Sequence, residues 1–360
     1  MKFSLPSFSS KKSVIGLDVG SATVKAVELT QRGRNRGFDL THLGVAKVPA
    51  EAIVQGAFLN AAAITEAIRE AIDNAKIRNK NVAAAVCGHS VIVKKVSLPA
   101  MTREELDEQI RWEAEQYIPF DVNEVNLDFQ ILDSADDQGQ MDVLLVAAKK
   151  DLIDDYVQVI SEAGLIPVAI DVAAFAVENA FESNYEVGKG DTVALVNLGA
   201  QVVNISIISG GVPCFTRDIT TAGNQYTEEI QKALSISFQE AERIKLGGGD
   251  GNGQDVVPQE VEQAMQSVTE TVIGEISRSL DFFAATSSDT RIERVYLSGG
   301  AARVSGLRAA FQERSGLPVD VLNPLSRMLS SGKFEQSYLD EVAPSLGVGV
   351  GLAMRKLERR

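Results

Sequence analysis

Two stretches of the chain decide the fold: VIGLDVGSATVKAVEL at 14–29 and VALVNLGAQVVNISII at 193–208. Each reads as an apolar strand, a tight turn of small residues with a glycine, and a second apolar strand. The matched positions are Asp18 with Asn197, Gly20 with Gly199, Thr23 with Val202 and Lys25 with Asn204. Two copies of one hairpin predict two similar halves. The alternative is coincidence, because a DxG turn between apolar strands is common.

Composition bounds the classes of protein that this chain can be. Its 360 residues predict two to three domains, and 45% hydrophobic residues are enough for packed cores. The formal net charge of −14 makes nucleic acid an unexpected primary partner. Cys87 and Cys214 lie in apolar stretches, which favours a reducing compartment over a disulfide scaffold or a zinc site. His42 and His89 leave little room for histidine-based catalysis.

The amino-terminal stretch MKFSLPSFSSKK lacks the long apolar core of a signal peptide. No window reaches 18 uninterrupted apolar residues, so we expect no membrane-spanning helix. We therefore expect a soluble cytoplasmic protein, which can still bind a membrane-bound partner.

Strands and helices alternate along most of the chain, which predicts an α/β architecture. A strand at 37–47, a helix at 61–75 and a strand at 81–88 follow the first hairpin. Residues 90–150 differ, because β-branched strands surround a charged helix that a capping box opens at Thr102–Glu105. This block reads as a small inserted subdomain.

The second half continues with helices at 224–234 and 259–286, and with the segment AERIK on a helix that Ser237 opens. The loop GGGDGNGQD is expected to be mobile, and a glycine-rich helix is expected to open at Pro344 and pack closely on a neighbour. The predicted division is a first core domain at 1–89 completed by 151–185 and 340–360, the insertion at 90–150, a second core domain at 186–235 and 290–339, and a smaller subdomain at 236–289.

The first hairpin offers a way of holding phosphate that differs from the common fingerprints, since neither GxxxxGK[ST] nor GxGxxG is complete. Its small turn residues let backbone N–H groups approach anionic oxygens; they are Gly20, Ser21, Ala22 and Thr23. Asp18 is the candidate carboxylate for the water shell of Mg²⁺, and Lys25 could neutralise a phosphate. The alternative is an ordinary hairpin in which Asp18 caps its own turn.

The second hairpin offers Gly199, Ala200 and Gln201, with the neutral Asn197 where the first has a carboxylate. An amide can bind a metal-bound water, but it cannot act as a general base.

Two further elements could hold a nucleoside. Glu242 and Lys245 are three residues apart on one helix, so they could hold ribose hydroxyls or form an exposed ion pair. The turn at Gly299–Gly300 could pack flat against a purine.

The order of these elements resembles the actin, Hsp70 and hexokinase superfamily. Within it the chain is most similar to the FtsA branch, with its inserted subdomain, and closer still to the PilM family of type IV pilus assembly proteins. The resemblance covers all but about a dozen amino-terminal residues. The segments that carry it are GLDVGSATVKAVEL, EAEQYIPFDVNEV, VAIDVAAFAVENAF, DITTAGNQYTEEIQKAL, AERIK and LSGGAARVSGL.

The resemblance implies an actin-like ATPase fold that binds ATP and Mg²⁺ between two similar halves. It implies a partner, the amino-terminal tail of the membrane-anchored PilN, in a groove beside the insertion. A protein of this family would be peripheral to the inner membrane, assemble as a homo-oligomeric ring, meet the motor ATPases and serve twitching motility. For the groove, the candidates are Val91, Val93, Trp112, Ile118 and Phe120.

Turnover is expected to be slow or absent, because relatives that hydrolyse ATP well carry Asp at the position of Asn197. Asp171 is either a hydrolytic base, as in kinases of the superfamily, or the N-cap of the next helix, and the N-cap is preferred. The alternative functions are a small-molecule kinase and an FtsA-type membrane-tethered filament. The carboxy-terminal MRKLERR is too short for a membrane anchor and is expected to dock on the protein itself.

Overall fold

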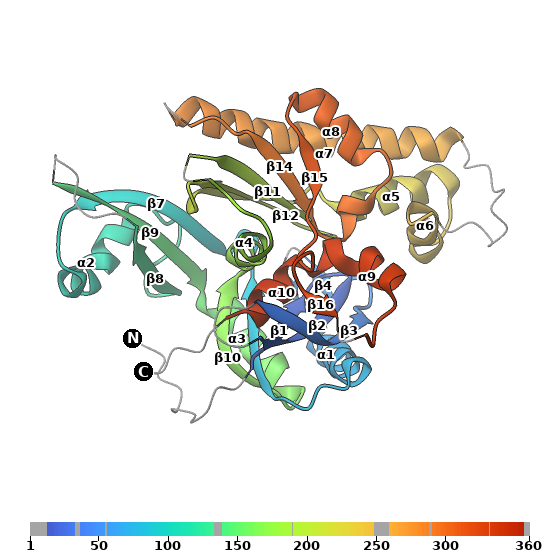
Figure 1. Ribbon diagram of the computed structural model, residues 1–360, viewed down its shortest axis with the longest axis horizontal. Coiled ribbons are helices and arrows are strands. Elements are labelled where there is room, and N and C mark those ends of the chain that lie inside the picture. Colours follow the sequence, from blue (N-terminus) through green and yellow to red (C-terminus); the bar gives the residue numbers. More distant parts are fainter. Residues whose placement is uncertain are drawn as a thin grey trace.

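The computed structural model describes residues 13–32, 37–54, 56–132, 139–188, 190–247, 259–287, 290–330 and 332–355. The first half is built on a six-stranded sheet of order β10-β6-β1-β2-β3-β16 (Figure 1). Its strands are β1 (Ile15–Val19), β2 (Thr23–Gln31), β3 (Phe38–Lys47), β6 (Asn81–Val86), β10 (Ile166–Val172) and β16 (Leu329–Ser330). Helices α1 (Ala61–Ala75) and α3 (Lys150–Glu162) pack on one face, and α4 (Ala173–Asn184) and α10 (Gly347–Ala353) cover the other.

The second half is built on a five-stranded sheet of order β13-β12-β11-β14-β15. Its strands are β11 (Thr192–Leu198), β12 (Val203–Ser209), β13 (Val212–Ile219), β14 (Arg294–Ser298) and β15 (Val319–Val321). One face packs on α7 (Gln259–Thr286) and α8 (Leu307–Ser315), while the other face meets α4 near the centre of the molecule (Figure 1).

The two sheets repeat one topology, which confirms the two similar halves. In the first, β3 and β2 are antiparallel, β2 and β1 are antiparallel, and β1, β6 and β10 are parallel. In the second, β13, β12 and β11 are antiparallel in the same order, and β11, β14 and β15 are parallel. The paired hairpins are therefore equivalent strands of equivalent sheets, and coincidence does not explain them.

Residues between β6 and α3 form a separate lobe, at the left of Figure 1. Its sheet has the order β7-β9-β8, from β7 (Val91–Pro99), β8 (Val125–Ile131) and β9 (Gln140–Lys149). Helix α2 (Arg103–Glu115) begins at Thr102 with the predicted capping box and packs on one face through Leu106, Ile110 and Ala114. The lobe therefore has its own hydrophobic core.

The remaining elements are short. They are β4 (Ile53–Val54), β5 (Ala57–Phe58), α5 (Gly223–Leu234), α6 (Phe238–Lys245), η1 (Gly300–Arg303), α9 (Gln336–Val342) and η2 (Ala343–Leu346). Helices α5, α6 and α7 share a small core of Ile230, Ala241 and Val261. None of the helices in the described residues is long and apolar enough to cross a bilayer.

The glycines of α10 permit backbone-to-backbone packing, which confirms the expected close contact. A methyl carbon on Gly351 would lie 2.5 Å from the carbonyl carbon of Ala176 in α4. One on Gly16 of β1 would lie 2.7 Å from the amide nitrogen of Ala353. Any larger residue would force these elements apart, so glycine is required at the contact.

Some boundaries differ from the expectation. The α-helix begins at Gly347, because Pro344 lies in the 3-10 turn η2. The chain rejoins the first sheet at β16, which pairs with β3 about ten residues before the predicted return at 340. Most of the acidic loop SADDQGQ between β8 and β9, and most of GGGDGNGQD, lies outside the described residues.

Candidate functional site

The two hairpin turns have the same backbone geometry. The Gly20 N–H donates to the Thr23 carbonyl at 3.1 Å, and the Gly199 N–H donates to the Val202 carbonyl at 3.0 Å. Within the described part of the chain, the turn amides of Ser21 and Ala22 have no protein acceptor. They are therefore open to an anionic ligand.

Asp18 and Lys25 face each other across the first hairpin. They are paired in the strand register, and the Lys25 Nζ lies 3.0 Å from the Asp18 Oδ2. Both side chains are more than four-fifths buried. The ammonium lies over the turn, since a methyl carbon on Gly20 would be 3.9 Å from it. Asp18 thus pairs with Lys25 instead of capping its own turn.

Asn197 begins a chain of hydrogen bonds that runs across the second sheet to the first half. Its Nδ2 donates to the Asn204 Oδ1 at 3.0 Å, and the Asn204 Nδ2 donates to the Asp218 Oδ1 at 2.8 Å. The other oxygen of Asp218 accepts from the Gly88 N–H at 2.5 Å. We call these residues the Asp218 chain. Asp218 opens the segment DITTAGNQYTEEIQKAL, but only the fold reveals its place in the site, because it reaches Asn204 through the pairing of β13 with β12.

The surroundings of the Asp218 chain disfavour charge. Asp218 keeps one side open to solvent, yet the protein around it removes hydration and raises the pKa of its carboxyl, against the opposing effect of its two hydrogen bonds. Burial, together with the charges of Asp218 and Asp18, raises the pKa of the Cys87 thiol to about 12. Cys87 is therefore a neutral thiol at physiological pH, and not a nucleophile.

Glu242 and Lys245 are joined to α5. The Lys245 Nζ lies 2.6 Å from the Glu242 Oε2, and it donates to the Thr227 hydroxyl at 3.0 Å and the Gly223 carbonyl at 3.3 Å. The Thr227 hydroxyl in turn donates to Glu242 at 2.5 Å. Because the Lys245 side chain is only 7% exposed, the alternative of an exposed surface ion pair is wrong for this lysine.

Helix α5 connects that pair to the second hairpin. The amides of Gly223 and Asn224 donate to the carbonyls of Gly199 and Ala200, at 3.0 and 2.7 Å. A methyl carbon on Gly223 would lie 2.9 Å from the Gly199 carbonyl oxygen and 3.0 Å from the Ala301 Cβ. The second hairpin, α5, α6 and the turn after β14 therefore meet at one place.

The two halves also touch at this level. The Gln201 Nε2 donates to the Ile53 carbonyl at 2.7 Å. Gly299 has a φ of +89°, which favours glycine, and its N–H donates to the Pro344 carbonyl at 2.6 Å; Gly300 follows as the first residue of η1. The two halves of the molecule are thus joined by hydrogen bonds close to the hairpin turns.

Asp171 lies at the end of β10 and is not an N-cap, so that preference was wrong. The N-cap of α4 is Val172, and Asp171 accepts from the Val172 N–H at 2.8 Å. Its other oxygen forms an ion pair with Arg355, just after α10. This contact fits the expected docking of the carboxy-terminal segment, of which residues 356–360 lie outside the described part.

Glu178 of α4 is a buried acid that no motif in the sequence singles out. Its side chain is buried between the halves and accepts a hydrogen bond from Ser206 of β12. Burial raises its pKa to about 8, the hydrogen bond from Ser206 opposes the rise, and the charges of Glu182 and Asp171 add to it.

The five candidate groove residues do not share one surface. Alternation along β7 places Val91 and Val93 on the sheet face opposite α2, and Val91 packs against the first-half core. Ile118 is buried with α2 in the core of the lobe, so it lines no open groove. Phe120 is partly buried there under the Lys149 ammonium, and Trp112 is 73% exposed on α2. The prediction of a single groove through all five is therefore wrong, because the sheet and its helix lie between them.

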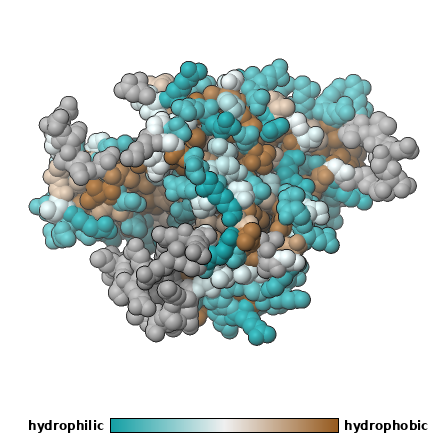
Figure 2. Space-filling model, viewed as in Figure 1, coloured by the Kyte–Doolittle hydropathy of each residue, from teal (hydrophilic) through white to brown (hydrophobic). Residues whose placement is uncertain are grey.

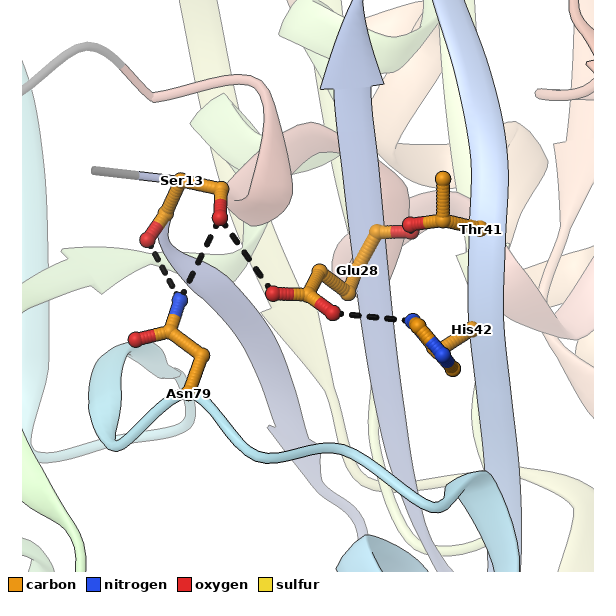
Figure 3. Close-up of polar contacts among 5 residues, drawn as sticks. All are labelled: Ser13, Glu28, Thr41, His42 and Asn79. Atoms are coloured by element: carbon orange, nitrogen blue, oxygen red, sulfur yellow. Dashed lines mark hydrogen bonds and ion pairs between the residues drawn. The ribbon is translucent and has the colours of Figure 1, made fainter. Parts of the chain in front are cut away.

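His42 belongs to a separate polar cluster at the opposite end of the β1–β2 hairpin from the turn (Figure 3). Its Nδ1 lies 2.9 Å from one carboxylate oxygen of Glu28, and Ser13 donates to the other at 3.2 Å. Asn79 donates to the Ser13 carbonyl at 2.5 Å, and Thr41 to the Glu28 carbonyl at 2.8 Å. This cluster joins strands and the loop before β6, away from the hairpin turns.

The residues around the hairpin turns fit a nucleotide with a hydrated cation. Open amides and the Lys25 ammonium suit phosphate. The Glu242–Lys245 pair, with its lysine buried and its glutamate partly exposed, lies where the second hairpin and the Gly299 turn meet. The described residues contain no cluster of three or more His, Cys, Asp or Glu able to hold a metal directly. A cation here would be held through water, as expected for Asp18 and Mg²⁺.

Comparisons with known proteins agree with this architecture. A solved PilM–PilN type IV pilus biogenesis complex is 27% identical, covers 97% of this chain and 100% of its own, and has a TM-score of 0.84. The ethanolamine utilization protein EutJ from Carboxydothermus hydrogenoformans (15% identity, TM-score 0.56, 95% and 89% covered) shares the fold alone. The cell division protein FtsA of Bacillus subtilis (strain 168) is 23% identical over 94% of this chain and 82% of its own.

The family model described as type IV pilus assembly protein PilM matches residues 16–357, nearly the whole chain. With its actin-like ATPase fold and inserted lobe, this chain belongs to the PilM family of type IV pilus assembly proteins.

Proposed function

We propose that this protein is an ATP-binding scaffold of type IV pilus assembly that recruits the amino-terminal tail of PilN. The observation that carries the proposal is the similarity, along the whole chain, to a PilM that was solved as a complex with PilN. Through such a tail the protein would act at the inner membrane, and would connect the membrane complex to the motor as one subunit of a ring that serves twitching motility.

The tail would dock on the face of the lobe that carries Val91 and Val93. β7 is an edge strand of its sheet, and the Val93 carbonyl already accepts from the Thr216 hydroxyl at 3.2 Å. An extended peptide beside it would therefore bind mainly by placing alternate side chains in pockets. The face continues onto β9 through Val146, which is paired with Val93 and partly exposed. In the view of Figure 2, hydrophobic side chains are exposed on the lobe.

A binding experiment separates the two faces of the lobe. A labelled peptide of the PilN tail is titrated into the wild type, Val93→Asp and Trp112→Ala, with thermal unfolding as the folding control. We expect Val93→Asp to weaken binding at least about tenfold, because a carboxylate would be desolvated in the pocket. Trp112→Ala should bind like the wild type. The opposite result would move the site to α2, and full affinity of both variants would overturn docking on the lobe.

ATP with Mg²⁺ would lie between the halves, its phosphates against the two hairpins and its nucleoside near Glu242, Lys245 and Gly299–Gly300. Bound ATP supplies an anion that both hairpins can hold at once. Lys25 would neutralise a phosphate, and Asp18 would accept from the water shell of the cation. Hydrolysis would be slow, since Asn197 offers an amide and not a carboxylate. Calorimetry on folded protein that detects no affinity for Mg²⁺–ATP would overturn this part.

A filament of FtsA type is the second candidate, favoured by the FtsA relatives that match over nearly the whole chain. Its membrane anchor could not be α10, because every residue of that helix is buried. Sedimentation with nucleotide separates the two, since long polymers would favour the filament and a closed oligomer would favour the scaffold ring. A small-molecule kinase has less support, because its one candidate base, Asp171, is paired with Arg355.

A further inference from the structure

The direction of the hydrogen bonds in the Asp218 chain is fixed at one end. Asp218 accepts from both of its neighbours, the Gly88 N–H and the Asn204 Nδ2. A carboxylate can only accept, so it turns the amide of Asn204 with its nitrogen toward Asp218. The oxygen of Asn204 then faces Asn197 and accepts from the Asn197 Nδ2.

At the far end of the Asp218 chain, one side-chain oxygen has no hydrogen-bond partner in the described residues. The Asn197 Oδ1 has no protein partner in the described part of the chain, and the side chain of Asn197 is only partly buried. Asn197 stands two residues before the turn glycine of the second hairpin, as Asp18 stands two residues before the turn glycine of the first. The Asp218 chain therefore turns an oxygen, and not an NH₂ group, toward the side on which a hydrated cation would lie.

We propose that Asp218 is a positioning residue: through Asn204 it orients the amide of Asn197 so that its oxygen accepts from a water of the Mg²⁺–ATP complex. This inference rests on the proposed binding of nucleotide. In this role the oxygen of Asn197 accepts a hydrogen bond from a water, which an amide can do. No carboxylate is then present at this position to take a proton during hydrolysis.

The substitution Asp218→Asn tests the inference because it can keep every contact while reversing the chain. The new amide accepts from Gly88 with its oxygen and donates to the Asn204 Oδ1 with its nitrogen. Asn204 then donates to Asn197, so Asn197 presents its NH₂ group to the cation's water. That water donates hydrogen bonds but cannot accept one, because its oxygen faces the cation. Stability should change little while the oxygen acceptor is lost.

The readout is the factor by which Mg²⁺ raises ATP affinity, from calorimetry with Mg²⁺ and with EDTA. A hydrogen bond to a charged group corresponds to a factor of about 10 to 100. We expect Asp218→Asn to lower the Mg²⁺ factor about tenfold and to change the affinity in EDTA less than about twofold. Asp142→Asn, which removes a carboxylate paired with Lys95 in the lobe, should change neither.

A double variant separates orientation from loss of charge. In Asp218→Asn with Asn204→Asp, the middle residue becomes the acceptor, so Asn197 again donates to it and turns its oxygen outward. The net charge also returns to that of the wild type, and we expect the Mg²⁺ factor to recover. Should Asp218→Asn unfold, Asn204→Ser interrupts the chain and leaves the Gly88–Asp218 bond in place, with the same expected loss.

The outcomes are distinct. If the wild type binds no ATP, the proposed nucleotide site fails and the inference fails with it. If the wild type binds ATP with a Mg²⁺ factor that Asp218→Asn leaves unchanged, or with no Mg²⁺ factor at all, only the inference is overturned. An equal loss of affinity with Mg²⁺ and with EDTA would assign Asp218 to holding the halves together and would also overturn it.

Discussion

Replacing Glu178 with glutamine should reveal how much stability the protein loses by burying an acid between its halves. Glu178 is 7% exposed, and burial raises its pKa from about 4.5 to about 8. Between these values the folded chain keeps the proton and the unfolded chain has released it. Because the unfolded chain then binds fewer protons, the free energy of unfolding falls as pH rises.

The size of the effect follows from the width of this pH range. Each pH unit corresponds to about 1.4 kcal/mol, so the contribution of Glu178 is complete below about pH 4.5 and falls by about 5 kcal/mol as pH rises to about 8. Glutamine has no proton to lose and can still hydrogen-bond Ser206. The variant should therefore gain about 4 kcal/mol over the wild type between pH 5 and pH 8.

Urea unfolding of both proteins at pH 5, 6, 7 and 8 measures this difference. Glu186→Gln is the matched control, because Glu186 is an exposed acid paired with Arg327 and should leave the pH dependence unchanged. Ser206→Ala should extend the fall to higher pH, since it removes the hydrogen bond that lowers the pKa of Glu178. Parallel curves for the wild type and Glu178→Gln would refute the reasoning.

Three further outcomes follow from local geometry. Gly351→Ala should destabilise the protein by several kcal/mol in urea unfolding, because its methyl carbon would lie 2.5 Å from the Ala176 carbonyl carbon; stability equal to the wild type would contradict the packing of α10 on α4. Thr102→Ala should cost about 1 kcal/mol, since it removes the N-cap of α2; no loss would mean that the capping box contributes nothing. Asn197→Asp should keep ATP affinity in calorimetry and raise turnover in a phosphate-release assay. A wild-type turnover of about ten per second, ordinary for an enzyme, would show that the missing carboxylate does not limit hydrolysis.

The fold could be predicted from local signals because the hairpins carry their own pattern. Alternating apolar residues, small turn residues and matched positions at Asp18 and Asn197 identify equivalent strands, and sheet pairing then repeats around them. The start of α2 could be predicted for the same reason, since a capping box lies within four residues.

What escaped prediction depends on residues that are distant in the sequence. Asp218 reaches the site only because β13 pairs with β12, and Arg355 reaches Asp171 only because α10 packs beside β1 and α4. The error at the lobe has a different cause. Periodicity gave the buried side of α2, but it could not show that Val93 and Trp112 lie on opposite sides of a sheet.

The return of the chain to the first half has a consequence for synthesis on the ribosome. Strands β1 and β2 are made first, yet the helix that covers them, α10, is made last. The contacts of Gly16 and Val27 with α10 can therefore form only when translation is nearly complete. The second half, whose strands and helices run from 192 to 321, can form earlier. The second half can then complete its core before the first half does, and a nascent chain that stops before Gly347 would leave the surface of β1 and β2 that α10 covers open to chaperones or proteases.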